Sequence, residues 1–255
     1  MDPVVDEAAR AAISDRERRL GVTIPAAVAE WYTLGGADAV EVLAGSNDDY
    51  ALRIEELGEP FDGWGGGRRD FIREGLLVIR IENQGVCYWA VPLDDGDDPR
   101  VLVEVDSPPD RLLWQLHAPS FSAYVFTLGW DRLAFGLPYG LAAQDQPLGE
   151  RDLALLEQRF VPQPSTYAWP GRVNYRFERG DQRVMVWNAD GFEPDDPRAE
   201  FGGQADWWLH AGTATSLASL AGELRGCGGL ATRLYAISGG SAAEQVISDL
   251  RAVAG

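Results

Sequence analysis

The sequence predicts an α+β protein, with an N-terminal helix pair packed on an antiparallel sheet, followed by a second small α+β region. Two observations favour this class. Apolar residues recur at helical spacing near the start of the chain and again after residue 120, whereas short apolar runs between turn residues fill the stretch from 76 to 105. A third observation divides the chain: 136–149 has no clear periodicity, so we expect a domain at 1–135, a linker, and a C-terminal region at 150–255.

The start of the chain predicts two helices and then short extended segments. The first helix is expected to begin at Pro3, with Asp2 in the N-cap position, and to end at Gly21. The second is expected between Pro25 and Gly35, and it carries three large apolar side chains on one face: Val28, Trp31 and Tyr32. Two β-like segments follow: Ala39–Leu43 and Tyr50–Ile54.

The middle of the chain predicts three consecutive antiparallel strands and a helix. Two apolar runs, Leu76–Glu82 and Val86–Leu93, flank Asn83-Gln84-Gly85, which is typical of a tight hairpin. A second turn, Asp94–Pro99, precedes a third strand in which valine alternates with other residues from position 101. Ser120 is expected to cap a helix with one apolar stripe: Phe121, Tyr124, Val125 and Leu128.

The C-terminal region repeats the mixture of strands and helices. The expected elements are a helix at Glu150–Phe160, strands at Val173–Phe177, Val184–Trp187 and Ala205–His210, a helix at Leu217–Leu224 and a strand at Leu230–Ile237. A last helix is expected behind Ser241, because Ser241 and Glu244 have capping-box spacing. The strand tryptophans can stack on a sugar or a base, although such residues are more often core: Trp187, Trp207 and Trp208.

The chain is strongly acidic, and the acid is concentrated in its N-terminal half. Forty Asp and Glu oppose twenty-two basic residues, all of them arginine, for a net charge of −18. Residues 1–135 carry −13 of this charge, and two blocks, Asp38–Asp62 and Glu82–Asp110, carry −7 each. Such a charge repels phosphate backbones, so we expect no nucleic-acid partner. The acid blocks are either a docking surface for a basic protein or a solvated face that favours solubility.

Composition also excludes membrane and disulfide-framework classes. No apolar run approaches the ~20 residues of a membrane helix. The first residues lack the basic start and apolar core of a signal peptide, so a cytoplasmic location is expected. Cys87 and Cys227 are too few and too far apart for a disulfide framework or a zinc knuckle, and we expect both to be reduced packing residues.

The residue types that catalysis needs are sparse. Without lysine, Schiff-base chemistry and a P-loop lysine are excluded. The two histidines, His117 and His210, form neither HExxH nor an i, i+4 pair, and no GxSxG elbow occurs. A dyad of Cys87 with either histidine stays an alternative, but the apolar run around Cys87 favours packing. We therefore predict no catalytic residue, no metal ligand and no cofactor.

Two loops have compositions found in ligand sites. Gly63–Gly67 precedes two arginines but lacks the GK[ST] ending of a phosphate loop, so a surface loop is the favoured interpretation. Asp94–Asp98 resembles a calcium loop only in its acid content. Gly96 falls at its third position instead of the sixth, and the final glutamate is missing, which favours a hairpin turn.

The segment Glu17-Arg18-Arg19-Leu20-Gly21-Val22-Thr23-Ile24-Pro25, with Trp31-Tyr32 and Gly35-Gly36 after it, resembles the opening of a known family. This family is the SUKH superfamily, the Smi/Knr-type immunity domains. Two later segments resemble its central hairpin and closing helix: Glu82–Ala90 and Phe121–Tyr124. The resemblance covers about residues 5–135, and residues 136–255 match no family that we can name.

The resemblance implies a domain that binds protein partners and has no catalytic residues. Bacterial members are typically immunity proteins that neutralise toxins, many of them nucleases. We therefore expect a non-enzymatic immunity protein that binds a basic toxin stoichiometrically. Two alternatives stay open: a regulatory or housekeeping scaffold of the same fold, and an enzyme with an unrecognised site in 136–255. The oligomeric state also stays open.

The family motif transfers no binding residues, because the partner surface varies among members. The acid blocks supply the candidates instead, since their turn-rich context favours exposure. The expected partner-binding residues are Asp48, Asp49, Glu55, Glu56, Asp94, Asp95, Asp97 and Asp98.

Overall fold

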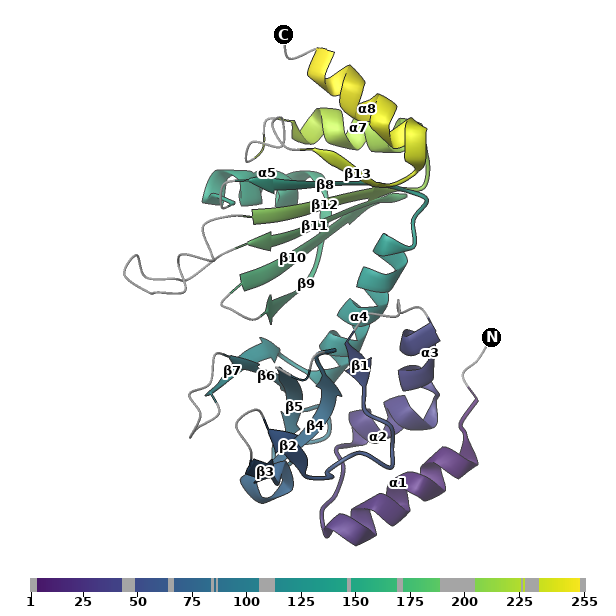
Figure 1. Cartoon of the computed structure of the whole chain (residues 1–255), viewed down its shortest axis with the longest axis vertical. Coiled ribbons are helices and arrows are strands. Elements are labelled where there is room, and N and C mark those ends of the chain that lie inside the picture. The colour runs from purple at the N-terminus through teal and green to yellow at the C-terminus, as the bar shows by residue number, and fades with distance from the viewer. Residues whose placement is uncertain are drawn as a thin grey trace. The chain divides into compact units, whose positions relative to one another are not determined.

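The computed structural model describes residues 4–42, 49–63, 67–83, 85, 87–105, 113–145, 148–168, 172–188, 205–225, 227 and 234–252. The chain divides into unit 1 (Met1–Gly129) and unit 2 (Trp130–Gly255). Each unit combines helices with an antiparallel sheet, which confirms the α+β class (Figure 1). The division falls inside helix α4 (Phe121–Phe135), ahead of the expected domain limit at residue 135.

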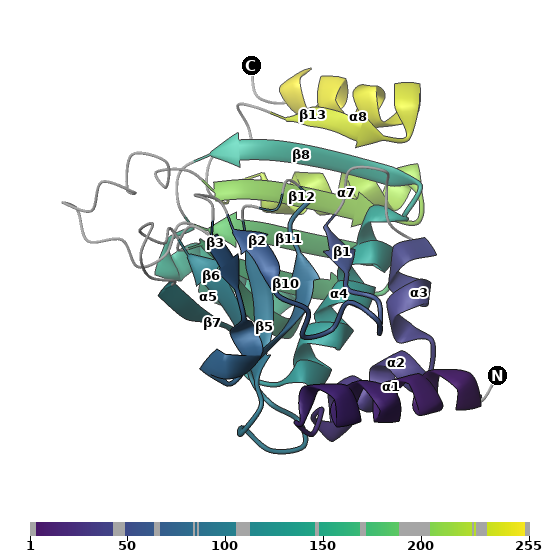
Figure 2. The same ribbon diagram turned by 60° about the horizontal axis from the view of Figure 1, so that its bottom comes forward.

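Unit 1 places three helices beside a five-stranded sheet. The helices are α1 (Glu7–Leu20), α2 (Ala26–Thr33) and α3 (Gly36–Val42), and α1 lies alongside α2 (Figure 2). The sheet has the order β1-β4-β5-β6-β7, made of β1 (Tyr50–Ala51), β4 (Leu76–Ile81), β5 (Tyr88–Pro92), β6 (Val101–Val105) and β7 (Leu113–Ala118). A small hairpin and a 3-10 helix complete it: β2 (Phe61–Gly63), β3 (Gly67–Arg69) and η1 (Phe71–Glu74).

Capping residues explain where the first helices begin and end. The Asp6 carboxylate accepts hydrogen bonds from the first N–H groups of α1, and Gly21 ends that helix at φ +68°. The expected cap Asp2 lies outside the described residues, and the helix starts later than predicted. Pro25 directly precedes α2, as expected. The β-like segment expected at Ala39–Leu43 is wrong over its described part, because α3 is helical there, in line with the helix preference of its alanines.

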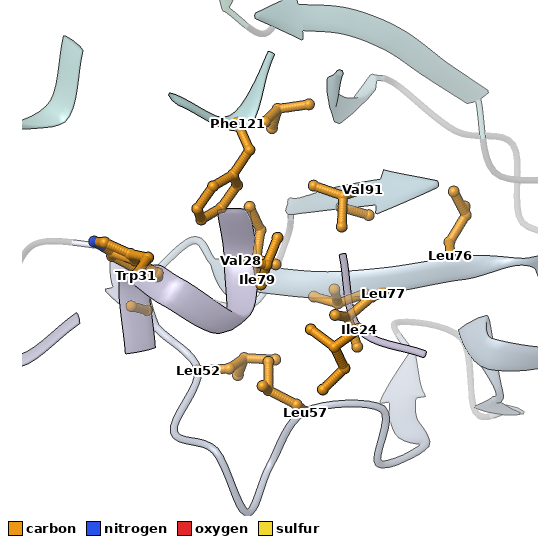
Figure 3. Packing of buried hydrophobic residues seen from close by; sticks show 14 of the residues in the cluster. Ile24, Val28, Trp31, Leu52, Leu57, Leu76, Leu77, Ile79, Val91 and Phe121 are labelled. Atoms are coloured by element: carbon orange, nitrogen blue, oxygen red, sulfur yellow. The ribbon is translucent and has the colours of Figure 1, made fainter. Parts of the chain in front are cut away.

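The core of unit 1 forms where α2 packs on the sheet. Trp31 and Val28 of α2 lie against Ile79 and Phe121 in this cluster (Figure 3). Trp31 is only 7% exposed, which confirms its expected core position. A Cβ at Gly36 would lie 2.0 Å from the Trp31 ring, so glycine is required for the chain to pass the indole.

Unit 2 is built around a six-stranded antiparallel sheet in the order β13-β8-β12-β11-β10-β9. The strands are β8 (Tyr139–Asp145), β9 (Val161–Ala168), β10 (Arg172–Arg179), β11 (Gln182–Asn188), β12 (Ala205–Ala211) and β13 (Tyr235–Ser238). Its helices are α5 (Glu150–Arg159), α7 (Ala214–Leu224) and α8 (Gly240–Ala252). One face of the sheet and all three helices share a buried apolar cluster, with Trp207 and Leu220 among its fully buried members.

Two expectations for this part of the chain are corrected, and a third is confirmed in part. The linker at 136–149 is wrong, because most of it is β8, which pairs with β12 on one side and β13 on the other. Its run of glycine and alanine has little strand preference, so pairing with distant strands decides its structure. The capping box is also wrong, since Ser241 lies inside α8. The strand expected at Leu230–Ile237 is confirmed from Tyr235 onwards, where β13 runs to Ser238, and residues 230–233 lie outside the described residues.

Candidate functional site

The acidic turn between β5 and β6 is part of the packing of unit 1. The carbonyl of Asp97 accepts a hydrogen bond from the N–H of Ala27 at 2.8 Å, at the first turn of α2. The Asp98 carboxylate accepts the N–H of Ser122 at 2.8 Å, at the first turn of α4. The first N–H groups of a helix have no partner within it, so this turn satisfies donors of two helices. Its position explains why the turn is ordered.

The same turn leaves two carboxylates facing solvent. Asp95 is held, because its carboxylate accepts the N–H of Arg100 at 2.9 Å and lies 3.7 Å from that residue's Nε. The side chains of Asp94 and Asp97 are exposed and have no hydrogen-bond or ion-pair partner within the described residues. The expected hairpin turn is therefore observed, and only part of its negative charge is free.

The other four expected partner-binding residues differ from one another. Asp48 lies outside the described residues. Asp49 forms an ion pair with Arg80 of β4, with its Oδ2 at 3.4 Å from Nη2. The Glu56 carboxylate accepts the backbone N–H three residues before it at 2.8 Å. Glu55 is exposed and has no such partner in the part of the chain described. Of this group, Glu55 alone combines a described position with a free carboxylate.

Glu55 lines a hollow of about 350 Å³ in unit 1. The hollow is formed by the first turns of α1, the connection from α2 to α3, and the chain after β1. Two more carboxylates line it, Asp6 and Asp38, together with one arginine, Arg53. Asp6 caps α1, whereas Asp38 is exposed and has no partner among the described residues. Alanine supplies much of the remaining lining: Ala8, Ala9, Ala12, Ala37 and Ala51.

The structure thus gathers acid that the sequence places far apart. Asp6 and Asp38 were not expected site residues, since Asp6 lies outside both acid blocks and Asp38 only begins one. The helix-cap pattern at the start of α1 identifies Asp6 as structural, but no local signal shows that it shares a hollow with Glu55. The arrangement favours a cationic group of a partner, because three carboxylates face one guanidinium.

A second polar cluster in unit 1 is buried. The Arg80 guanidinium lies 5.3 Å from the centroid of the Trp89 ring, in addition to its ion pair with Asp49. His117 packs edge-on between Trp89 and Tyr124, with ring centroids 6.1 and 5.6 Å apart. Burial raises the pKa of the Tyr124 hydroxyl. Contacts of this kind order the ring of aromatic side chains around Arg80.

The two thiols are buried in different units. Burial, helped by the negative charge of Glu104, raises the pKa of Cys87 to about 12, and its Sγ donates to the Glu104 carbonyl. Burial also raises the pKa of Cys227. A thiol of raised pKa is a poor nucleophile and a poor metal ligand at neutral pH. Among the described residues, no three His, Cys, Asp or Glu side chains converge as metal ligands.

His210 is the buried histidine of unit 2. It is 1% exposed, neither ring nitrogen has a hydrogen-bond partner within the described residues, and burial lowers its pKa to about 4. Its ring packs edge-on against Phe135 at 4.8 Å. Trp187 and Trp208 pack against each other at 4.9 Å, and Trp207 is fully buried. A hollow of about 240 Å³ in unit 2 has a separate lining: Leu234, Glu244, Ile247, Ser248 and Arg251.

Comparison with known proteins adds no assignment to this geometry. No family model, no curated protein and no solved structure matches the chain. Among the described helices, none has both the length and the apolar composition needed to cross a membrane. The acidic positions of unit 1 are therefore the candidate site on the strength of their charge and exposure.

Proposed function

We propose that the chain is a non-enzymatic protein-binding module of the immunity type, which neutralises a basic toxin domain by stoichiometric binding. One observation carries this proposal. Unit 1 presents four exposed carboxylates that form no ion pair within the described residues: Asp38, Glu55, Asp94 and Asp97. Complementary potential of this kind steers a basic partner towards the surface and disfavours acidic ones.

The SUKH resemblance of residues 5–135 supports the same function by a separate argument. Its opening motif covers the end of α1 and the whole of α2, where Gly21 turns the chain and Pro25 precedes the next helix. The family resemblance favours a protein partner, and the charge favours a basic one. A nuclease toxin combines both properties, since a nuclease must itself bind a polyanion.

The buried histidine of unit 2 is the observation that bears on the enzyme alternative. His210 has a strongly lowered pKa, as catalytic groups often do. Its ring is packed against Phe135, and it does not line the hollow described in unit 2. General acid–base chemistry needs hydrogen-bond reach to a substrate. We therefore favour binding over catalysis.

The proposal is tested by capture followed by an inhibition titration. The full chain is immobilised, proteins from native lysate are bound at low salt, and the retained protein is identified and purified. Its enzymatic activity is then titrated with the chain. Loss of activity that ends at a fixed stoichiometric ratio supports an immunity function. An acidic partner, or a basic one whose activity is unchanged at excess chain, contradicts it.

A further inference from the structure

The two main sheets end in four edge strands, and these differ in how strand pairing is prevented. The edge β1 has only two residues. The edge β13 has four residues and a shift of register opposite Gly140. The edge β9 carries Pro162 and Pro164, which cannot donate to a further strand. Short length, irregular register and proline are ordinary ways to block an edge.

Among the described residues the fourth edge is β7, which shifts register only towards its C-terminal end, between Leu116 and Ala118, and pairs regularly with β6 from Leu113 to Leu116. It has six residues with the sequence Leu-Trp-Gln-Leu-His-Ala, and it contains neither proline nor any Asp, Glu or Arg. The sheet order ends at β7, whose inner side pairs with β6, and Figure 1 shows it as the outer strand of unit 1. An uncharged edge with a regularly paired stretch is a template for another strand, and proteins that keep one commonly use it for binding.

The side chains of β7 offer apolar contacts to a further strand. Trp114 is half-buried and packs edge-on against Phe71 at 6.0 Å, on the face of the sheet where the main core of unit 1 lies. Leu116 lies on the same face, because strand side chains alternate, and it is 40% exposed. Gln115, between them, lies on the opposite face. An added strand would place apolar side chains beside Trp114 and Leu116.

Charge decides between the two kinds of strand that can pair here. A second copy of the chain carries the same net charge of −18 and is repelled. Only Arg111 and Leu112 separate the strand β7 from the acid block Glu82–Asp110, which carries −7. We propose that β7 is the docking edge for an extended, basic segment of the protein partner, which adds to the sheet as a sixth strand. This inference rests on the proposed function and gives it a mode of recognition.

A synthetic peptide tests the inference without knowledge of the partner. The probe is acetyl-Arg-Val-Arg-Val-Arg-Val-amide, labelled for fluorescence anisotropy at low salt. Its first control is the same peptide N-methylated at alternate residues, which keeps the charge but removes backbone donors. Its second control replaces each arginine by glutamine. Hydrogen exchange of the full chain, with and without each peptide, locates the binding.

We expect the arginine peptide to bind and to slow amide exchange at Trp114–Leu116. N-methylation should weaken it by about tenfold or more, because ladder hydrogen bonds are lost. Leu116→Lys should weaken binding by about tenfold, since lysine on an edge disfavours pairing. Val161→Lys is the matched control: it adds the same charge on the β9 edge, where Val161 is 60% exposed, and should change binding less than about twofold.

Other outcomes overturn the inference in distinguishable ways. Equal binding of the methylated and unmethylated arginine peptides means association by charge alone, which removes strand addition and leaves the proposed function standing. If the glutamine peptide binds as tightly as the arginine peptide, the inference that the partner segment is basic is wrong. Protection confined to other segments, or binding by none of the peptides, removes β7 as the docking edge. A wild-type dimer that Leu116→Lys dissociates assigns the edge to a second copy and contradicts the basic partner.

Discussion

A helix is anchored to a sheet in both units, but by different chemistry. In unit 1, Trp31 anchors α2, with its ring edge-on to Tyr32 at 4.9 Å and to Phe121 at 5.5 Å. In unit 2, Asp131 anchors the last turns of α4. Its two carboxylate oxygens accept hydrogen bonds from the Arg176 guanidinium of β10 at 2.6 and 2.8 Å. The anchor of α2 is apolar, whereas the anchor of α4 adds a bidentate ion pair to the apolar contacts of Trp130 and Ala134 with Met185.

The two anchors differ in how they respond to pH and to the substitution of a single residue. A ring packed among apolar groups keeps its contribution across pH, because no charge takes part. The Arg176 side chain is 3% exposed, so its charge depends on Asp131 and on further acceptors such as the Thr166 hydroxyl. A buried pair adds little net stability over an apolar pair, but the loss of one member leaves a buried charge without compensation. The anchor of α4 should therefore respond to single polar substitutions more sharply than the anchor of α2.

The largest expected effect is that of Asp131→Ala. It leaves the Arg176 guanidinium buried without its carboxylate, and should lower the free energy of unfolding of unit 2 by about 3–5 kcal/mol. Denaturant dependence of amide exchange in β10 and β11 measures this, because it reports on one unit. Asp94→Ala, at an exposed position, is the control, and it should change the free energy of unfolding by no more than about 0.5 kcal/mol. The double variant Asp131→Leu with Arg176→Met should regain most of the loss, and its failure to do so would show that the pair itself stabilises.

Trp31→Ala should cost about 3–5 kcal/mol in unit 1, from lost apolar burial and the cavity left behind. Amide exchange in β4 and β5 gives the readout. This cost should not change with salt, in contrast to any ionic anchor. Phe126→Ala, at a position 49% exposed, should cost less than about 1 kcal/mol. If Trp31→Ala lowers the free energy of unfolding by less than about 1 kcal/mol, the conclusion that Trp31 anchors α2 is wrong.

His210 makes the stability of unit 2 depend on pH. Its folded pKa of about 4 lies below the ordinary value of 6.5, so the unfolded chain binds the proton first as pH falls. Above pH 6.5 the His210 imidazole is neutral in both the folded and the unfolded chain, so its titration costs no stability. On going to pH 4, the free energy of unfolding of unit 2 should fall by roughly 3 kcal/mol. His210→Leu removes this slope. As pH falls from 6.5 to 4, the free energy of unfolding of the wild type should therefore fall relative to that of His210→Leu, and a constant difference between the two proteins would contradict the assignment.

The smallest effect on stability is expected for the acidic turn of unit 1. Asn in place of Asp94, Asp95, Asp97 and Asp98 keeps a side-chain oxygen at each position, including the one that accepts the Ser122 N–H. Stability should therefore change by no more than about 0.5 kcal/mol. Association with the partner should slow, and its salt dependence should flatten, because exposed charge acts through steering.

The matched control for this turn removes four exposed charges from unit 2. It combines Glu150→Gln, Glu157→Gln, Glu244→Gln and Asp249→Asn, all at exposed positions. Association rates are measured against ionic strength for the three proteins. If the control slows association as much as the turn variant does, net charge acts as a whole and the turn is no docking surface.

The sequence predicts elements whose signals are local. The strands β4, β5 and β6 follow from apolar runs between clear turns, and α2 follows from its proline and its apolar face. Elements that depend on distant pairing were missed. The strand β8 contains Gly140 and three alanine or leucine neighbours with no alternation, and β9 has prolines at its second and fourth residues, so neither resembles a strand before its neighbours are known.

The sequence likewise predicts some features of the candidate site and not others. Charge composition correctly indicates free acid at Glu55, Asp94 and Asp97. It cannot show that Asp98 accepts a hydrogen bond from a helix that begins 23 residues later, or that Asp6 and Glu55 share one hollow. Partners of a carboxylate are set by tertiary packing, which leaves no periodic trace in the sequence.

Site-specific labelling of this protein is unusually direct because both native thiols are buried. Cys87 is 6% exposed with a pKa near 12, and Cys227 is 0% exposed, so a maleimide should react slowly with either in the folded chain. Every basic side chain is arginine, so amine-reactive reagents have no lysine to modify. A single cysteine introduced at an exposed position would therefore carry a fluorophore or a spin label at one defined point, without prior removal of the native residues.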